Sequence, residues 1–476
     1  MTDATVTMDQ YPQPGAGQPR PWAFPAPERG ALPNGMAVLR CHRPGQQVMA
    51  VEISLDLPLD AEPDGLDGVD TIMMRALSQG AGPHSAEEFA AELERSGATL
   101  DAYADYDAAR LSLEVPVSRL AGALALVTEA LSAPAFSARE VDRLVRNRLD
   151  GIVLEVANPG RRAALQLPRE LFPASARMSR PRQGTTDTVA RIDSDAVRAF
   201  YAANLRPAAA TVVIAGDLTG IDVDALLAAT LGRWNGDPTP PSPAPPVSAD
   251  DAGRVVVVDR PGAVQTQLLI GRTGPDRHDM RWPGLVLGTY CLGGTLTSRL
   301  DRVLREEKGY TYGVRAGERV LRSAAPSDRD RVTGMSLVAI SGSVDTASTG
   351  PALSDLWQVL RTLAAGGLTD SERDLAVQNL VGVAPLRYET AASVASTMAD
   401  QVEQHLPDDY EAHLYERLAT TGTPEATAAV VAAFPPDRLV TVLVGDASQI
   451  HSPVTDLGIG PVTVVTGWPP VEQPAP

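Results

Sequence analysis

The chain has 476 residues, of which 44% are apolar and 21% charged, a balance that excludes a disordered or fibrous protein. At ~100–200 residues per domain it has room for at least two domains. Its 59 acidic and 41 basic side chains give a formal charge of −18, which would repel a phosphate backbone, so no nucleic-acid partner is expected. Apolar runs such as residues 428–434 are far shorter than the ~20 residues of a membrane helix, so no membrane partner is expected.

The N-terminal stretch, residues 1–28, is polar and lacks the apolar segment of a signal peptide, which predicts a disordered lead and a cytoplasmic protein. The two cysteines, Cys41 and Cys291, lie 250 positions apart, and the chain has no C-x-x-C pair. This spacing excludes a disulfide framework and a cysteine-based zinc site. Both cysteines are expected to be buried free thiols.

Strands and helices alternate irregularly through the first half. A strand is expected near Ala50, and Ser85 with Glu88 forms a capping box that predicts a helix. Phe89 and Leu93 share one face of that helix. Then follow three further elements, namely a strand over 111–117, a helix over 120–133 and a long helix that begins near Ser137.

A Pro-rich linker over residues 237–253 divides the chain into two halves, 29–236 and 254–462, with a tail over 463–476. The halves echo each other at two places. TVVIAGDL (211–218) returns as VTVLVGDA (440–447) at an offset of 229, and FSAREVDRL (136–144) returns as LTDSERDLA (368–376) at an offset of 232. The two agreeing offsets indicate a duplication. We therefore expect an α+β protein of two homologous halves, each a mostly antiparallel sheet covered by helices.

The histidines lack the spacing of a helical zinc site, which needs two ligands at i and i+4. They are His42, His84, His278, His405, His413 and His451. The nearest two, His405 and His413, are eight residues apart, which favours a solvated polar segment over a ligand cluster. G-x-S-x-G, Walker A and G-x-G-x-x-G sequences are absent too, so the common hydrolase, NTPase and dinucleotide signatures are missing.

Residues 291–317 stand out in the second half. Gly293 and Gly294 interrupt an apolar run, and residues 296–306 then have helical spacing. Gly309 is expected to end this helix, and residues 310–314 alternate like a strand.

This arrangement would place two polar side chains close together. Arg305 would lie in the last helical turn and Tyr312 in the adjoining strand, so that a guanidinium and a phenol could converge. Pattern alone favours the simpler alternative, in which Arg305 is solvated and Tyr312 is a half-buried strand aromatic.

The run GGTLTSRLDRVLREEKGYTYGV resembles the C-terminal half of pitrilysin/insulinase-type (M16, subgroup M16B) metallopeptidases. Those proteins carry a glycine-rich loop, S-R-L, and then an Arg and a Tyr seven residues apart, here Arg305 and Tyr312. They too are built from duplicated α+β halves joined by a linker, so the resemblance covers most of the chain.

The first half departs from the family at the metal site. Active members carry H-x-x-E-H and, 76 residues beyond the second His, a Glu ligand. Aligning the flanking glycines places Thr71 and Arg75 at the two His positions, Met74 at the catalytic Glu and Gly151 at the third ligand. These four residues cannot assemble a tetrahedral zinc site, so no metal is expected in this chain.

A rescue of the metal site by neighbouring acidic residues is the alternative. The candidates are Asp67, Asp70 and Asp150. Acidic side chains without a His partner rarely hold catalytic zinc, so this alternative is disfavoured.

The resemblance implies the non-catalytic subunit of a heterodimeric zinc metalloendopeptidase that processes unstructured peptides. The zinc would be held by a partner carrying H-x-x-E-H, and the two chains would enclose a chamber. Arg305 and Tyr312 would stabilise the transition state in the partner's site, and Gly293 and Gly294 would let the backbone approach the peptide. The alternatives are a scaffolding subunit and a peptide-binding homodimer without peptidase activity.

Overall fold

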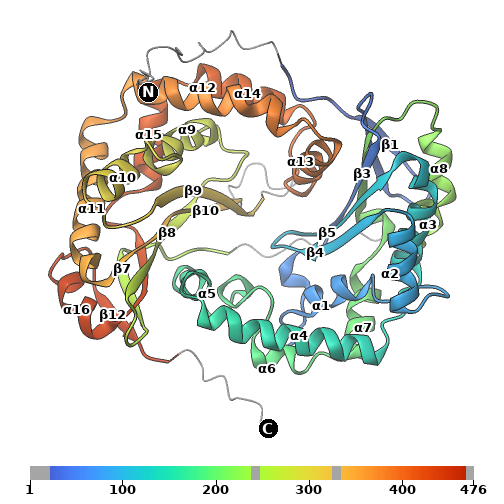
Figure 1. Cartoon of the computed structure of the whole chain (residues 1–476), viewed down its shortest axis with the longest axis horizontal. Coiled ribbons are helices and arrows are strands. Elements are labelled where there is room, and N and C mark those ends of the chain that lie inside the picture. Colours follow the sequence, from blue (N-terminus) through green and yellow to red (C-terminus); the bar gives the residue numbers. More distant parts are fainter. Residues whose placement is uncertain (1–21, 237–246, 324–333, 468–476) are drawn as a thin grey trace, which may run out of the picture.

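Two six-stranded sheets form the centres of the two halves in the computed structural model, which describes residues 22–236, 247–323 and 334–467 (Figure 1). The strands of the first sheet are β1 Glu28–Ala31, β2 Ala37–His42, β3 Val48–Asp56, β4 Thr99–Ala104, β5 Ala108–Pro116 and β6 Ala210–Gly216. Those of the second are β7 Arg254–Asp259, β8 Gln265–Gly274, β9 Val314–Arg322, β10 Met335–Asp345, β11 Val440–Gly445 and β12 Val462–Val465.

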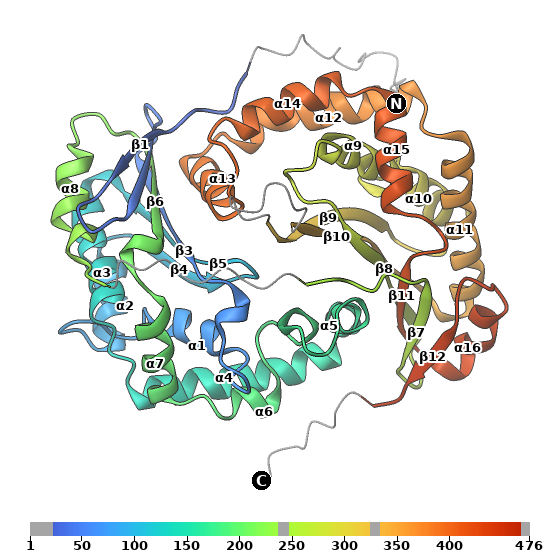
Figure 2. The ribbon, with the colours of Figure 1, turned by 180° about the vertical axis from the view of Figure 1, so that it is seen from behind.

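Helices surround both sheets (Figures 1 and 2). The first half contains α1 Val69–Ala76, α2 Ala86–Arg95, α3 Leu120–Ser132, α4 Ala138–Ala157, α5 Pro159–Leu171, α6 Thr186–Val189, α7 Ser194–Asn204 and α8 Val223–Ala229. The second contains α9 Trp282–Gly293, α10 Arg299–Asp301, α11 Thr349–Gly366, α12 Asp370–Arg387, α13 Ala391–Glu403, α14 Tyr410–Thr420, α15 Thr423–Ala433 and α16 Ala447–Thr455.

The two sheets have matching strand orders, β1-β2-β6-β3-β5-β4 and β12-β7-β11-β8-β10-β9. The two Gly-Asp runs become the equivalent strands β6 and β11, each parallel to one neighbour and antiparallel to the other. The second pair of echoes becomes α4 and α12, which begin at the matching caps Ser137 and Thr369. The predicted α+β fold of two homologous halves is confirmed.

The local signals of the first half also form as expected. Ser85 accepts a hydrogen bond from the Glu88 backbone N–H at 3.2 Å, and the Glu88 carboxylate accepts one from the Ser85 N–H at 2.9 Å. Phe89 and Leu93 are both buried beneath α2. Cys41 and Cys291 are buried free thiols, as predicted.

Each half lends one helix to the sheet of the other. α5 of the first half packs on β8 and β11, where Leu167 and Leu171 join a core that contains Val442. α13 of the second half packs on β3 and β6, where Met398 shares a core with Val213. The two halves are therefore interlocked, although the linker between them is a single segment.

A buried ion pair strengthens the second of these contacts. Arg110 on β5, only 3% exposed, donates to both carboxylate oxygens of Glu403 at 2.8 and 2.6 Å and to Asp400 at 2.6 Å. Ser54 on β3 donates to the same Glu403 at 2.8 Å. Because the Arg110 guanidinium is buried and bonded to two side chains of α13, it fixes the position of α13 on the first sheet.

The predicted helix and strand around Gly309 both begin later in the chain than expected. The helix begins at Arg299 rather than at residue 296, and it continues as a π-helical turn, Arg302–Glu307. The strand begins only at Val314, so Tyr312 lies in the preceding loop. Gly309, with φ of +67°, ends the helix as predicted, because a side chain would be strained in that conformation.

Three predicted segment boundaries also shift. The lead was expected to be disordered to residue 28, but Trp22 and Phe24 pack on Tyr388 of the second half, with ring centroids 5.5 and 4.9 Å apart, and Glu28 already belongs to β1. In the linker, Asp251 pairs with Arg272 and Arg438, and residues 237–246 lie outside the described residues. The second half reaches past 462, because β12 continues to Val465, and residues 1–21 and 468–476 are outside the description.

None of the helices in the described ranges has the length and apolar character needed to cross a membrane.

Candidate functional site

The four positions aligned with the zinc machinery come together where α1 packs against α4. Thr71 and Arg75 lie one turn apart on α1; Thr71 is buried and Arg75 is exposed. Met74 is fully buried in the core of the first half. Gly151 lies on α4, where an added Cβ would come within 3.4 Å of the Arg148 guanidinium.

Two arginines that the sequence did not single out occupy this contact. Arg182 donates to the Thr71 hydroxyl at 3.0 Å and pairs with Asp70 at 3.2 Å. Arg148, beside Gly151 on α4, holds the two carboxylate oxygens of Glu155 at 2.8 and 2.9 Å. A position that would bind a dication in an active relative is thus surrounded by guanidinium groups.

The two arginines near Arg75 also disfavour a metal cation at this place. Burial of part of its side chain lowers the pKa of Arg75, and the positive charges of Arg148 and Arg182 lower that pKa further, whereas Glu155 opposes them. A field that disfavours one more positive charge also disfavours a metal cation.

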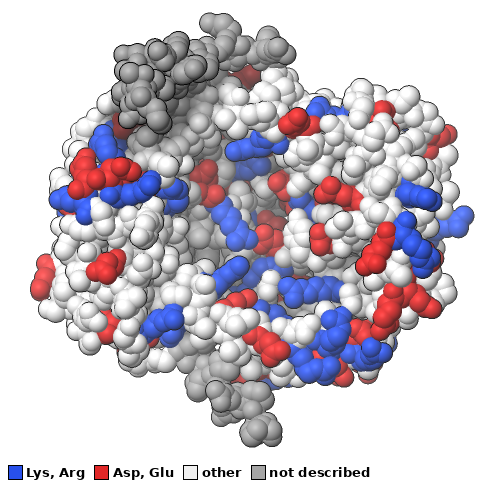
Figure 3. Space-filling model, viewed as in Figure 1, with Lys and Arg blue, Asp and Glu red and all other residues white. Residues whose placement is uncertain are grey.

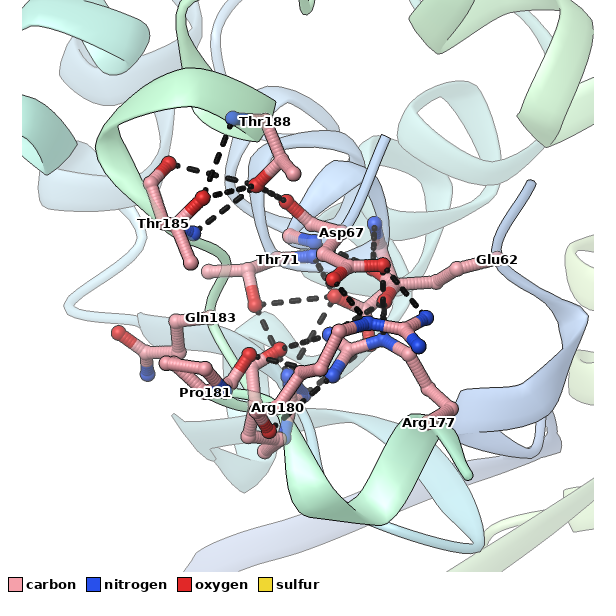
Figure 4. A network of polar contacts seen from close by, with 12 residues as sticks. Glu62, Asp67, Thr71, Arg177, Arg180, Pro181, Gln183, Thr185 and Thr188 are labelled. Atoms are coloured by element: carbon pink, nitrogen blue, oxygen red, sulfur yellow. Dashed lines mark hydrogen bonds and ion pairs between the residues drawn. The ribbon is translucent and has the colours of Figure 1, made fainter. Parts of the chain in front are cut away.

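A loop over residues 177–188 lies against the N-terminus of α1 and fixes it through buried ion pairs (Figure 4). Arg177 pairs with Glu62 at 2.6 Å and with Asp67 at 3.2 Å, and Arg180 pairs with Asp67 at 2.6 Å. The Thr188 hydroxyl donates to the Asp67 carbonyl at 2.9 Å.

Glu62 connects this loop to the first turn of α1. Its carboxylate accepts hydrogen bonds from the backbone N–H groups of Gly68 at 2.8 Å and Asp70 at 3.2 Å. Burial and the nearby Asp70 charge raise the pKa of Glu62 well above its usual value, while Arg177 opposes that shift. The helix start and the loop are therefore locked together.

The three acidic residues considered as substitute zinc ligands do not form a ligand cluster. Asp67 and Asp70 are bound to arginines, and Asp150 is exposed on α4. Over residues 22–236, 247–323 and 334–467, no group of three or more His, Cys, Asp or Glu side chains could hold a metal ion.

The second candidate site is the connection between the π-helical turn and β9. Arg305 lies in that turn, 34% exposed, with Glu306 as its ion-pair partner at 3.6 Å. Tyr312 is 92% exposed, so it is neither the half-buried strand residue of the simpler prediction nor covered by the described parts of the chain.

The loop that carries Tyr312 is held on both sides. The Thr311 hydroxyl donates to the Ser343 carbonyl at 2.7 Å, and the Tyr310 N–H donates to the Leu304 carbonyl at 2.9 Å. A fixed backbone therefore presents a freely accessible phenol, which is the arrangement of a contact residue.

Gly293 and Gly294 end α9 next to this connection. A Cβ on Gly293 would lie 2.4 Å from the backbone nitrogen of Ala316, and one on Gly294 would lie 2.7 Å from Tyr290. Close packing of α9 against β9 therefore requires Gly293, and the close approach of the chain to the last turn of α9 requires Gly294. Their contact with a peptide stays a prediction.

The two candidate sites are far apart in this chain. Figures 1 and 2 place α1 and α10 in different halves, with strands β5 and β9 between them. Arg305 and Tyr312 thus do not face the zinc-like positions of their own chain.

A hollow lies between the halves, with charges of both signs around it (Figure 3). Its cavity of about 540 Å³ is lined in part by Arg110, Glu318 and Arg319. Arg319 on β9 donates to both carboxylate oxygens of Asp105 in the first half at 2.9 Å, so this ion pair links the two halves beside the hollow. Burial raises the pKa of Glu318 to about 7.

Comparisons with known proteins agree on one family. The family model described as "Insulinase (Peptidase family M16)" matches residues 38–158, and "Peptidase M16 inactive domain" matches residues 191–380. An uncharacterized zinc protease of Streptomyces coelicolor is 26% identical over 60% of this chain, which spans 63% of that relative, less than two thirds of its length. An uncharacterized zinc protease of Mycobacterium leprae is 24% identical over 78% of this chain and 81% of the length of that protein.

Solved structures share the fold. A peptidase M16 inactive domain from Pseudomonas fluorescens matches with a TM-score of 0.78 at 21% identity, over 88% of this chain and 98% of that one. A protease from Helicobacter pylori matches with a TM-score of 0.78 at 16% identity, over 89% and 100% of the two chains.

Proposed function

Because this chain belongs to peptidase family M16 and resembles a pseudo-peptidase, we propose that it is the non-catalytic subunit of a two-chain zinc metalloendopeptidase. The partner would carry H-x-x-E-H and the zinc, and the substrate would be an unstructured peptide. The observation that carries the proposal is the contrast between a metal site filled by arginines and an exposed Tyr312 on a fixed loop.

The first part of that contrast supports the absence of independent peptidase activity. Hydrolysis by this family's chemistry needs ligands for zinc and a base to activate water. At these positions the chain supplies a hydroxyl bonded to Arg182, a guanidinium and a buried thioether. Met74 accepts no proton, and Arg75 repels a metal.

The second part supports a contribution to a site on another chain. A tyrosine at 92% exposure buries little apolar surface, while its loop is held by Thr311 and Tyr310. Tyr312 would donate its hydroxyl, and Arg305 its N–H groups, to the carbonyl oxygen of the peptide as negative charge develops there.

The test uses this chain mixed with the H-x-x-E-H family member from the same cells and an unstructured fluorogenic peptide. We expect the mixture to cleave the peptide and a chelator to inhibit that cleavage. Neither chain alone should cleave the peptide. Tyr312→Phe should lower kcat by about 10²–10³ with little change in assembly.

Tyr310→Phe is the matched control, because it removes a hydroxyl two residues away in the same loop. Arg302→Gln is the control for Arg305→Gln, since Arg302 lies in the same π-helical turn. Equal activity of Tyr312→Phe and wild type would exclude Tyr312 from catalysis. Recovery of the chain only with itself, or in a large inactive assembly, would favour a peptide-binding homodimer or a scaffold.

A further inference from the structure

A cavity of about 700 Å³ opens beside the arginine-filled site, between α1, α4 and strand β4. Two arginines, Arg75 from α1 and Arg143 from α4, line it together with Ser78 and Gln79. From β4, Asp101 contributes a carboxylate. The cavity is therefore polar, with cations on its helical wall and an acid on its strand wall.

Among the described residues that line this cavity, Arg75 is the cation without a hydrogen-bond or ion-pair partner in the described parts of the chain. Arg143 already bonds to Glu140 at 2.7 Å and to the side-chain oxygen of Gln79 at 2.5 Å. The guanidinium of Arg75 makes no hydrogen bond or ion pair with any residue in the described ranges. Partial burial and the positive charges of Arg148 and Arg182 disfavour the charge of Arg75, while Glu155 opposes them, and a bound anion would relieve the remaining repulsion.

The strand wall can accept an extended chain. β4 is the last strand of the first sheet, and among the strands of the described ranges it pairs with β5 alone, so the backbone groups along its other side have no partner among those strands. Such an edge can bind a peptide through main-chain hydrogen bonds. The cavity and the free edge adjoin, because Asp101 and Tyr103 of β4 line the cavity.

We propose that this cavity binds an extended peptide through a carboxylate that pairs with Arg75. The guanidinium fork fits a carboxylate with two parallel hydrogen bonds, and the edge of β4 holds the backbone next to it. The carboxylate comes from the peptide's C-terminus or from an acidic side chain. Asp101 repels a second carboxylate, so a peptide with one acidic group is preferred. This binding needs neither zinc nor a second chain.

The experiment measures fluorescence anisotropy of the isolated full chain with labelled octapeptides of alternating Val and Ser. One has a free C-terminus, one a C-terminal amide, and one an amide with a central Glu. We expect the free-acid peptide to bind about 10-fold or more tightly than its amide, the size of effect typical of a hydrogen bond to a charged group. Comparison with the Glu peptide shows which carboxylate is bound.

Variants connect this difference to Arg75. Arg75→Gln should abolish the preference for the acid, and Arg75→Lys should retain part of it. Arg143→Gln is the matched control and should preserve the preference, because its guanidinium is already bonded. Asp101→Asn should tighten binding of every acidic peptide.

Equal affinity of wild type for acid and amide peptides would overturn the proposal, as would an unchanged preference in Arg75→Gln. Because the measurement uses the chain alone, loss of the two-chain peptidase activity would leave its outcome unaffected. Circular dichroism of each variant shows that it is folded.

Discussion

The first helix of each half occupies the same place in the duplicated fold, but the two helices differ in charge. α1 follows β3, carries Asp70 and Arg75, and is tied at its start to the loop over 177–188. α9 follows the equivalent strand β8, carries no charged residue, and ends on Gly293, which packs against β9. The two halves thus share the same sheet. They differ at this helix, because charged groups surround α1, whereas α9 is followed in the chain by the exposed Tyr312.

The largest effect is expected from breaking the network at α1. Arg177→Met leaves the buried carboxylate of Glu62 without its main partner and removes one of the two arginines that hold the buried Asp67. The free energy of unfolding should fall by roughly 3–5 kcal/mol, the usual cost of breaking a buried pair. Urea denaturation measures this loss in the free energy of unfolding. Arg180→Met, whose side chain is 33% exposed, is the control with the smaller loss, and equal losses would contradict the central role of Arg177.

A second prediction concerns Glu52 of the first sheet, whose equivalent position in the second sheet carries an apolar side chain. Glu52 pairs with Val213 across the first sheet, and its counterpart across the second is Leu269, which pairs with Val442. Burial raises the pKa of Glu52 to about 7, so the folded chain binds a proton that the unfolded chain has lost. This contribution to stability is complete below a pH of about 4.5 and disappears as the pH rises through about 7.

Glu52→Gln should therefore stabilise the fold by roughly 1–3 kcal/mol above neutral pH, with a difference that shrinks toward acid pH. Thermal unfolding at several pH values measures this trend. Leu269→Met is the comparison at the equivalent position. Because neither side chain titrates, its effect on stability should not change with pH. A Glu52→Gln effect that grows toward acid pH would have the wrong sign.

The close packing of α9 can be tested by adding one methyl group. Gly293→Ala places a Cβ against the backbone of Ala316 and should cost about 1–3 kcal/mol. Gly317→Ala, in the adjoining strand, meets no atom within 4 Å and should be nearly neutral for packing. A neutral Gly293→Ala would show that α9 moves easily, unlike α1.

The smallest effect compares two equivalent helix starts. Ser137 caps α4 with one hydrogen bond, whereas Thr369 caps α12 in a full capping box with Glu372. Ser137→Ala and Thr369→Ala should each cost about 1 kcal/mol, with the larger loss at Thr369. Chemical denaturation of the two variants measures the order, and a larger loss at Ser137 would reverse the comparison.

The fold could be predicted because its signals are local. Strand runs closed by Gly-Asp and caps such as Ser85 lie within a few residues of the structure that they determine. Tyr312 was placed in a strand because five alternating residues suit a strand and a loop equally well. The Thr311 hydroxyl bond to β10, which holds the loop, depends on a residue distant in the sequence.

The arginine cluster was missed for the same physical reason. Arg148 and Arg182 reach α1 from a later helix and a loop, and no periodic pattern connects them with Thr71. One signal was available, since Arg177, Arg180 and Arg182 are concentrated within six residues of an acidic chain. Such a local excess of cations indicates buried acidic partners elsewhere.

The exchange of α5 and α13 between the halves affects how the protein is made. Synthesis proceeds from the N-terminus, so β3 and β6 leave the ribosome long before α13, the helix that covers them. During that interval the face of the first sheet that α13 covers is exposed, with the apolar Val213 and the ion-pairing Arg110 both without their partners on α13. At the same stage α5 has no sheet to pack on, because β8 and β11 are not yet translated. The nascent first half is therefore the stage most exposed to aggregation, and a chaperone that shields apolar surfaces would act there.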